Sequence, residues 1–298
     1  DGALAGALYP FPVLYTGGVN PLLWRPLVGI NALDVPAYEF DLTPFLAWLT
    51  DGRQHNITLS VFDNFAGTWY LDGVLVLRRD PRGAVLGGEV QVTAPERRLE
   101  QAALNASHGA VLQLMEGRLD FGARGLLRTA SGEVLASEVR GELAARSTNR
   151  DLGAYASVTD GTLHSRIVST AGSRRVTTEA DYPFHVFDRL VEDQSSMRLD
   201  AAVRYAYNMS VMYEDDWNAF FRSPPYAVAL YTSIDSSAAY NRSRGAGAVV
   251  HFAASESTED FRIWAGTVQA PTWLSWWGTW ADGKRTSAGA GSTCYARP

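Results

Sequence analysis

The sequence predicts an all-β fold of antiparallel β-sandwich or jelly-roll units with few short helices. Three features support this prediction: segments that alternate apolar and polar residues, frequent turn dipeptides, and a scarcity of helical periodicity. The chain has 298 residues, of which 46% are hydrophobic and 19% are charged, a composition that can bury a core. The net charge is −6 and the basic residues are scattered, which argues against a nucleic-acid-binding face. Apolar runs are too short to predict a membrane span.

Strands are predicted wherever β-branched and aromatic residues gather or alternate with polar residues. The segments with this pattern are residues 57–63, 68–77, 162–170, 245–252 and 261–268. Dipeptides that favour turns punctuate the chain. They are Asp51-Gly52, Asp72-Gly73, Ser131-Gly132, Asp160-Gly161 and Asp282-Gly283.

Residues 41–49 carry the best helical pattern. Asp41 or Thr43 is suited to cap the helix, and Pro44 is suited to its first turn. The apolar residues that follow share one face, so we expect a short helix that connects other elements. Residues 96–106 carry a second, weaker helical pattern.

A change in composition near residue 80 predicts two domains. Residues 1–80 are rich in Pro, Trp and Leu, and residues 81–298 are rich in Ala, Ser, Arg and Gly. We therefore expect a β-sandwich segment over 1–80 and a second β-rich sandwich over 81–298. The chain opens on Asp1-Gly2, a hairpin dipeptide, which favours a preceding strand and an incomplete first unit.

Neither a metal nor an organic cofactor is predicted. The five histidines are not at metal-ligand spacing, and the single cysteine, Cys294, excludes a cysteine cluster. Cys294 also cannot form a disulfide within the chain, so it is either a buried thiol or a partner to another chain. No phosphate-binding or dinucleotide-binding motif is present.

The candidate chemistry lies in residues 24–41. Trp24 can stack on a sugar ring, and Arg25 can bind a carbonyl or carboxylate oxygen. Asp34 and Glu39 can activate water or protonate a leaving group. Each acid also has a structural interpretation, at a strand end or in solvent, and Asp41 favours a helix cap.

Further residues that could contact a sugar follow on the next predicted hairpin. Asp63 and Trp69 could face the same cleft as residues 24–41. A later group of tryptophans, within residues 273–280, could form a sugar platform or belong to a core.

Four acceptor sequences for N-glycosylation favour a secreted protein. Their asparagines are Asn56, Asn105, Asn208 and Asn241. Asn56 follows the predicted turn at residues 51–52, where an exposed backbone could accept a glycan.

Three runs in the first 80 residues resemble the peptide:N-glycosidase A family of fungi and plants. They are residues 11–46, 51–61 and 69–77. The resemblance implies a secreted amidase that cleaves the bond between an asparagine side chain and the first N-acetylglucosamine of an N-glycan. It implies catalysis without a metal, in which a carboxylate from Asp34 or Glu39 activates water and Arg25 stabilises the oxyanion.

The resemblance also implies a longer protein, because members of this family carry a long N-terminal part before the hairpin dipeptide. We therefore expect an N-terminal chain of the same precursor as a partner and an N-glycosylated peptide or protein as substrate. Two alternatives remain: a shortened chain that folds alone, and a non-catalytic carbohydrate-binding or structural β-sandwich subunit.

Overall fold

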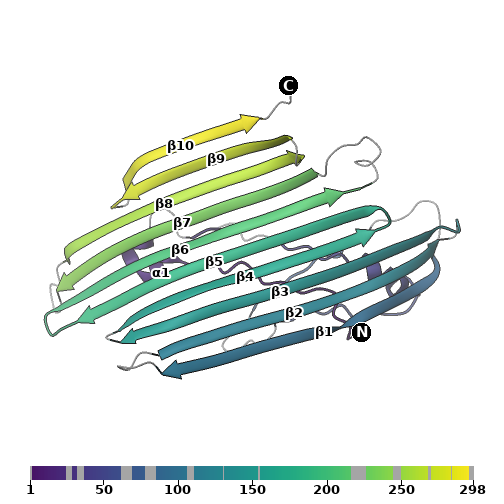
Figure 1. The fold of residues 1–298 in the computed structure, drawn as a ribbon, viewed down its shortest axis with the longest axis horizontal. Coiled ribbons are helices and arrows are strands. Elements are labelled where there is room, and N and C mark those ends of the chain that lie inside the picture. The colour runs from purple at the N-terminus through teal and green to yellow at the C-terminus, as the bar shows by residue number, and fades with distance from the viewer. Residues whose placement is uncertain are drawn as a thin grey trace.

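The computed structural model describes residues 2–24, 29–31, 37–61, 69–77, 85–105, 111–129, 131–153, 155–215, 226–243, 250–267, 270–282 and 284–294. Its main feature is one antiparallel sheet of ten strands, in which each strand pairs with the next in sequence (Figure 1). The strands are β1 (Val85–Asn105), β2 (Val111–Thr129), β3 (Val134–Gly153), β4 (Ala156–Ala171), β5 (Arg174–Glu192), β6 (Ser196–Glu214), β7 (Tyr226–Ser243), β8 (Val250–Thr267), β9 (Ala270–Ala281) and β10 (Lys284–Cys294).

The predicted all-β class with few short helices is confirmed. The helices are α1 (Thr16–Val19), η1 (Pro21–Trp24), η2 (Thr43–Phe45) and α2 (Leu46–Leu49), where η marks a 3₁₀ helix. The predicted sandwich takes a different form, because the described strands lie in one sheet rather than in two facing sheets. Consecutive antiparallel neighbours need only hairpin connections, so no crossover carries the chain to a second sheet.

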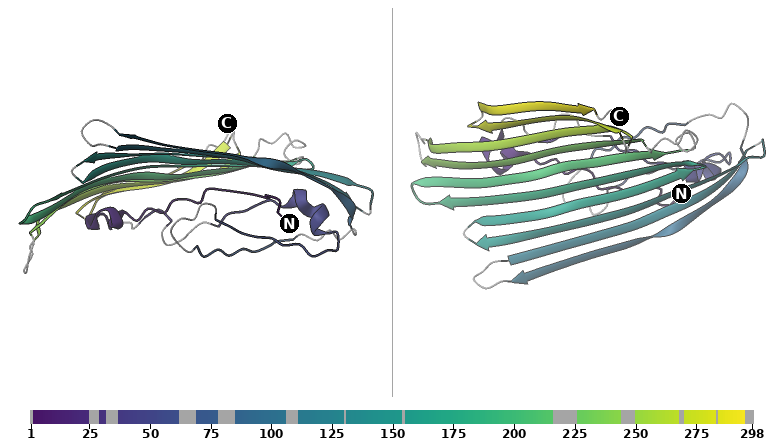
Figure 2. Two further views of the ribbon diagram at one scale, coloured as in Figure 1. Left: turned by 90° about the horizontal axis from the view of Figure 1, so that it is seen from below. Right: turned by 45° about the horizontal axis from the view of Figure 1, so that its top comes forward.

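The second layer of the molecule is the described part of residues 2–77, which runs beneath one face of the curved sheet (Figure 2). We call this the inner face of the sheet and the opposite one the outer face. Two segments of this layer, residues 57–61 and 69–77, were expected to be strands, yet they pair into no ladder. Their apolar side chains are exposed, 56% for Ile57 and 87% for Val74. The domain boundary near residue 80 stays a prediction.

The main core lies between the inner face and the chain of residues 11–30. Phe11, Leu23 and Ile30 are each at most 5% exposed. They pack with the inner faces of β5, β6 and β7, whose buried residues include Ala180, Tyr182, Val203, Tyr205, Tyr207 and Ile234. The Phe11 ring meets the Tyr182 and Tyr207 rings edge-on, with centroids 5.1 and 5.0 Å away, a favourable aromatic geometry.

A smaller core holds the predicted helix of residues 41–49 against β2 and β3. Phe45 packs with Ala123 and Val139, and Trp48 and Leu49 lie at the edge of the same cluster. Pro44 stands in the first turn of η2, as predicted. The second helical pattern, at residues 96–106, is wrong, because residues 96–105 continue β1 in register with β2.

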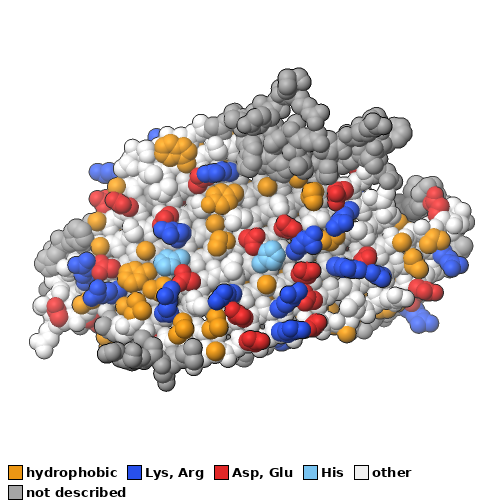
Figure 3. All heavy atoms as spheres, viewed as in Figure 1, with side chains coloured by type: hydrophobic (Ala, Val, Ile, Leu, Met, Phe, Trp, Pro, Cys, Tyr) orange, Lys and Arg blue, Asp and Glu red, His pale blue; other side chains and the backbone are white. Residues whose placement is uncertain are grey.

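The outer face is polar and carries interspersed positive and negative side chains (Figure 3). Many of them form ion pairs between neighbouring strands, such as Arg166–Glu179 at 2.8 Å and Arg204–Asp235 at 2.8 Å. His185 Nδ1 lies 2.6 Å from Asp160 Oδ1. That hydrogen bond, followed by one from Arg150, holds the pKa of Asp160 below its usual range. This face therefore needs no covering layer.

Candidate functional site

The chain that carries the candidate site is attached to the sheet through Tyr205 of β6. The Tyr205 hydroxyl accepts a hydrogen bond from the Ile30 amide at 2.7 Å and donates one to the Leu14 carbonyl at 3.1 Å. Burial raises the pKa of Tyr205 to about 12, so the phenol keeps its proton at any physiological pH. Gly29 is needed here, because a Cβ at this position would lie 2.6 Å from the Leu14 carbonyl oxygen.

Two further polar contacts fix the same chain. Asn20 is fully buried; its Nδ2 donates to the Leu199 carbonyl of β6 at 3.2 Å, and its Oδ1 accepts from the Leu22 amide at 3.0 Å. The Phe11 amide donates to the Tyr38 hydroxyl at 2.7 Å. Because buried polar groups need partners, the Asn20 contact fixes residues 20–22 on β6, and the Phe11 contact ties Tyr38 to the same layer.

The predicted site residues are only partly described. Arg25, Asp34 and Asp63 lie outside the described residues. Trp24 is the last residue of η1. The grouping of these residues in one cleft therefore stays a prediction.

Two predicted site residues have described side chains. Glu39 is exposed and lies in the chain that leads into η2. Trp69 is 55% exposed, which leaves its ring accessible to a ligand. Neither residue is buried in the core, so both remain available for a role at the surface.

Asp41 has a local structural role but is not the N-cap itself: it lies one residue before Leu42, the N-cap of η2, which makes no side-chain cap hydrogen bond. Its Oδ1 accepts a hydrogen bond from the Thr43 amide at 2.9 Å and another from the Thr43 hydroxyl. This pairing satisfies an amide at the start of η2, where helical amides lack partners. Asp41 is thereby engaged in structure, in contrast to Glu39.

Glu259 of β8 is a titratable residue of the inner face that sequence reasoning missed. It is 7% exposed, and its Oε1 has no hydrogen-bond partner. Burial raises its pKa to about 7. The available signal was weak: Glu259 is one of three acids in β8, with Glu256 and Asp260, and only its alternation with the apolar Phe261 places it on the inner face.

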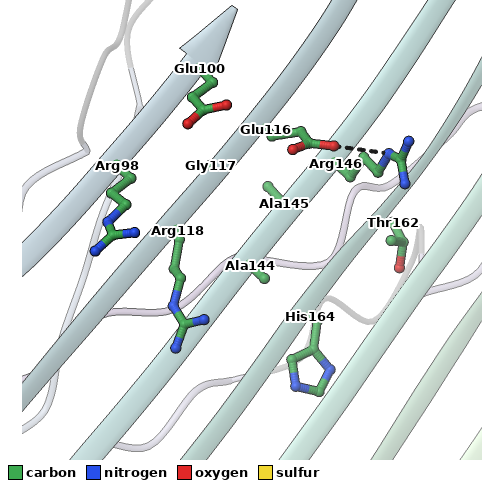
Figure 4. Close-up of a pocket in the computed structure, with 10 residues that line it drawn as sticks. All are labelled: Arg98, Glu100, Glu116, Gly117, Arg118, Ala144, Ala145, Arg146, Thr162 and His164. Atoms are coloured by element: carbon green, nitrogen blue, oxygen red, sulfur yellow. Dashed lines mark ion pairs between the residues drawn. The ribbon is translucent and has the colours of Figure 1, made fainter.

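A shallow depression lies on the outer face over β1 to β4, on the side of the sheet opposite residues 11–24 and 29–30 (Figure 4). Charged side chains surround it, and Arg146 Nε lies 3.2 Å from Glu116 Oε1. Its remaining lining residues are Arg98, Glu100, Gly117, Arg118, Ala144, Ala145, Thr162 and His164. Because it is open and lies on the opposite face, we do not assign the candidate chemistry to it.

The described residues contain no group of three or more histidine, cysteine or acidic residues that could hold a metal. They also contain no helix with the length and apolarity needed to cross a membrane.

The predicted glycosylation sites differ in their surroundings. Asn56 is exposed. Asn208 lies inside β6 and Asn241 near the end of β7, and the amide oxygens of both are buried without a hydrogen-bond partner. Asn105 is the last residue of β1. All four stay predictions as modification sites.

The comparisons with known proteins concern the first part of the chain. Residues 1–80 match the model of a family described as peptide N-acetyl-beta-D-glucosaminyl asparaginase amidase A. A relative from Prunus dulcis, peptide-N4-(N-acetyl-beta-glucosaminyl)asparagine amidase A, is 41% identical over 90 residues. The alignment covers 30% of this chain and 16% of the relative. No solved structure matches the chain. The predicted resemblance of residues 1–80 is thus confirmed.

Proposed function

We propose, from the match of residues 1–80 to a glycoamidase family, that this chain is part of a secreted enzyme that releases N-glycans from protein. The bond cleaved is the amide between asparagine and the first N-acetylglucosamine. The observation that carries the proposal is the 41% identity over 90 residues to a named amidase. The family match over residues 1–80 includes the candidate catalytic residues Arg25, Asp34 and Glu39.

The proposed reaction is hydrolysis of a carboxamide. One of Asp34 and Glu39 takes a proton from water, and the resulting hydroxide attacks the amide carbon. Arg25 stabilises the negative charge that develops on the amide oxygen. The other acid gives a proton to the departing nitrogen, so that the C–N bond breaks to aspartate and a glycosylamine. No metal takes part in this scheme.

The sugar is bound in this proposal by Trp24, Asp63 and Trp69. The exposure of Trp69 supports its part, since an accessible indole can stack on a sugar ring. The partner proposed is an N-terminal chain of the same precursor. The alignment covers only 16% of the Prunus dulcis relative, which leaves room for such a partner in a protein of that length.

The test is incubation of the purified chain with an N-glycosylated peptide in heavy-oxygen water. We expect conversion of the glycosylated asparagine to an aspartate that carries the heavy oxygen, read by mass spectrometry. Asp34→Asn and Glu39→Gln should each lower turnover by about 100-fold or more, because each removes an acid–base group at nearly constant volume. Glu89→Gln, at an exposed position of β1, is the matched control and should keep full turnover.

Two other outcomes are informative. The chain could bind the glycopeptide and leave its asparagine unchanged, both by itself and when co-expressed with an N-terminal chain. That outcome would favour the carbohydrate-binding alternative. Turnover only after co-expression would support the partner chain, and native mass spectrometry should then record both polypeptides in one complex.

A further inference from the structure

Glu259 is a carboxyl group in an environment that favours its neutral form. It stands on the inner face of β8, opposite Ile234 of β7 and Gly278 of β9 in the strand register. The side chain is 7% exposed and Oε1 makes no hydrogen bond. An ionised carboxylate without a partner is costly in such a place, whereas a protonated one is tolerated.

No described neighbour on this face offers a compensating charge. The helix η1 (Pro21–Trp24) contacts both β7 and β8 and contains no ionisable residue. Tyr205 is a titratable group near Glu259, and after burial the charge on Glu259 contributes to the raised pKa of that phenol. The remaining inner-face positions of the adjoining strands are uncharged: Thr232, Ile234, Ser236, Trp276, Gly278 and Trp280.

The position of Glu259 links its protonation state to how tightly the N-terminal layer binds to the sheet. Tyr205, Ile234 and Glu259 are directly paired positions on β6, β7 and β8. Tyr205 binds the Ile30 amide and the Leu14 carbonyl. The helix η1, which contacts β8, lies between Leu14 and Ile30 in the chain that Tyr205 binds. If this chain separates from the sheet, water reaches the carboxyl group and it ionises at its ordinary pKa.

We propose that Glu259 is a proton sensor whose protonated form strengthens the docking of residues 11–24 and 29–30 on the sheet and whose ionised form weakens it. The regulatory meaning rests on the proposed function, because residues 24–39 carry the proposed catalytic groups. The docking equilibrium itself does not depend on what the chain catalyses.

The pH window follows from the two states. The carboxyl has a pKa of about 7 when residues 11–30 are docked and its ordinary value of 4.5 when they are released. The docked state therefore binds more protons between these values. Docking is tightest below pH 4.5, weakens as the pH rises to about 7, and is then constant. The gap between the two pKa values corresponds to a total loss of docking of about 300-fold, of which about 100-fold falls above pH 4.5.

Hydrogen exchange of the Ile30 amide measures this equilibrium directly. Exchange is followed by mass spectrometry from pH 4.5 to 8 and corrected for the intrinsic rate at each pH. In the native sequence the protection of Ile30 should fall by about 100-fold across this range. In Glu259→Gln, which keeps the shape and cannot ionise, protection should be independent of pH. Glu256→Gln, an exposed position on the same strand, is the control and should behave as the native sequence does.

Three outcomes would overturn the proposal. Protection of Ile30 in the native chain could be constant with pH, or could fall in parallel in the native chain and Glu259→Gln. A direct NMR titration of the Glu259 carboxyl in the native chain could give its ordinary pKa, which decides the matter even if Glu259→Gln fails to fold. Glycopeptide turnover is assayed on the same samples. If the hydrogen exchange of Ile30 behaves as expected but no glycopeptide is turned over, only the proposed function is refuted.

Discussion

At the scale of single residues, the attachment of the two layers depends on one phenol. The Tyr205 hydroxyl is donor to Leu14 and acceptor from Ile30 at once, and its ring belongs to the main core. A tyrosine suits this position because it combines a large apolar surface with one polar group at its tip. Loss of the hydroxyl leaves a buried amide unpaired, which costs more than the mean value of a hydrogen bond.

Tyr205→Phe should therefore lower the free energy of unfolding by about 1–3 kcal/mol. Urea denaturation followed by tryptophan fluorescence measures the change. Tyr155→Phe, at a position 79% exposed, is the control and should stay within about 0.5 kcal/mol of the native chain. Equal effects of the two substitutions would contradict the attachment described.

Asn56 should carry a glycan when the chain is produced in a secretory host. Its side chain is exposed in a chain that joins no ladder, so a glycosyltransferase can reach it. Asn208 should remain unmodified, because it lies inside β6 with a buried amide oxygen. Peptide mapping by mass spectrometry checks both positions, and an unmodified Asn56 would refute the expectation.

At the scale of elements, aromatic rings cover glycines of neighbouring strands. Phe121 of β2 is paired with Gly141 of β3, and Phe184 of β5 with Gly161 of β4. A Cβ on either glycine would lie 2.1 to 2.2 Å from the ring, so each glycine makes space for the aromatic side chain. Such pairs compensate for the weakness of glycine in a strand.

Gly141→Ala should destabilise the chain by about 1–3 kcal/mol, because the added methyl group collides with the buried Phe121 ring. Gly117→Ala is the control, since its nearest contact would be 3.4 Å away. Thermal denaturation of both variants measures the difference. In a Phe121→Leu background, which reduces the collision, the cost of Gly141→Ala should shrink; an unchanged cost would exclude this explanation.

The glycine–aromatic pairs explain why one turn dipeptide predicted a turn correctly and another did not. The Ser131-Gly132 turn was predictable, because Gly132 has a φ of 82°, a conformation that glycine adopts without strain. Asp160-Gly161 was predicted to turn as well and is wrong, because Gly161 lies within β4 opposite Phe184. The dipeptide alone does not distinguish a glycine that forms a turn from a glycine that makes space for an aromatic ring. The residue paired with it on the neighbouring strand determines which of the two is found.

At the scale of the molecule, residues 1–80 and the sheet share their main core. Phe11, Leu23 and Ile30 are buried against β5 to β7, together with neighbours of their own layer such as Leu14 and Leu22. The sequence indicated the β-rich class and the family of residues 1–80 through local patterns and resemblance. It could not indicate this shared core or Glu259, because both depend on contacts between segments distant in the chain.

A chain of residues 81–298 alone should expose the inner face around Val203 and Ile234, which are at most 1% exposed in the full chain. We expect strong binding of the dye ANS and a lower unfolding temperature than in the full chain, because a large apolar patch faces water. Fluorescence titration and calorimetry measure the two properties. A fragment as stable as the full chain and free of dye binding would support two independent domains instead.

The attachment of Ile30 to Tyr205 spans 175 residues of sequence, whereas the sheet grows only by neighbouring hairpins. During synthesis the residues around Ile30 therefore leave the ribosome long before their binding surface exists. At typical elongation rates this interval is about 10–35 s. Throughout it the apolar side chains of Phe11, Leu23 and Ile30 are uncovered, which makes this segment a natural client for chaperones.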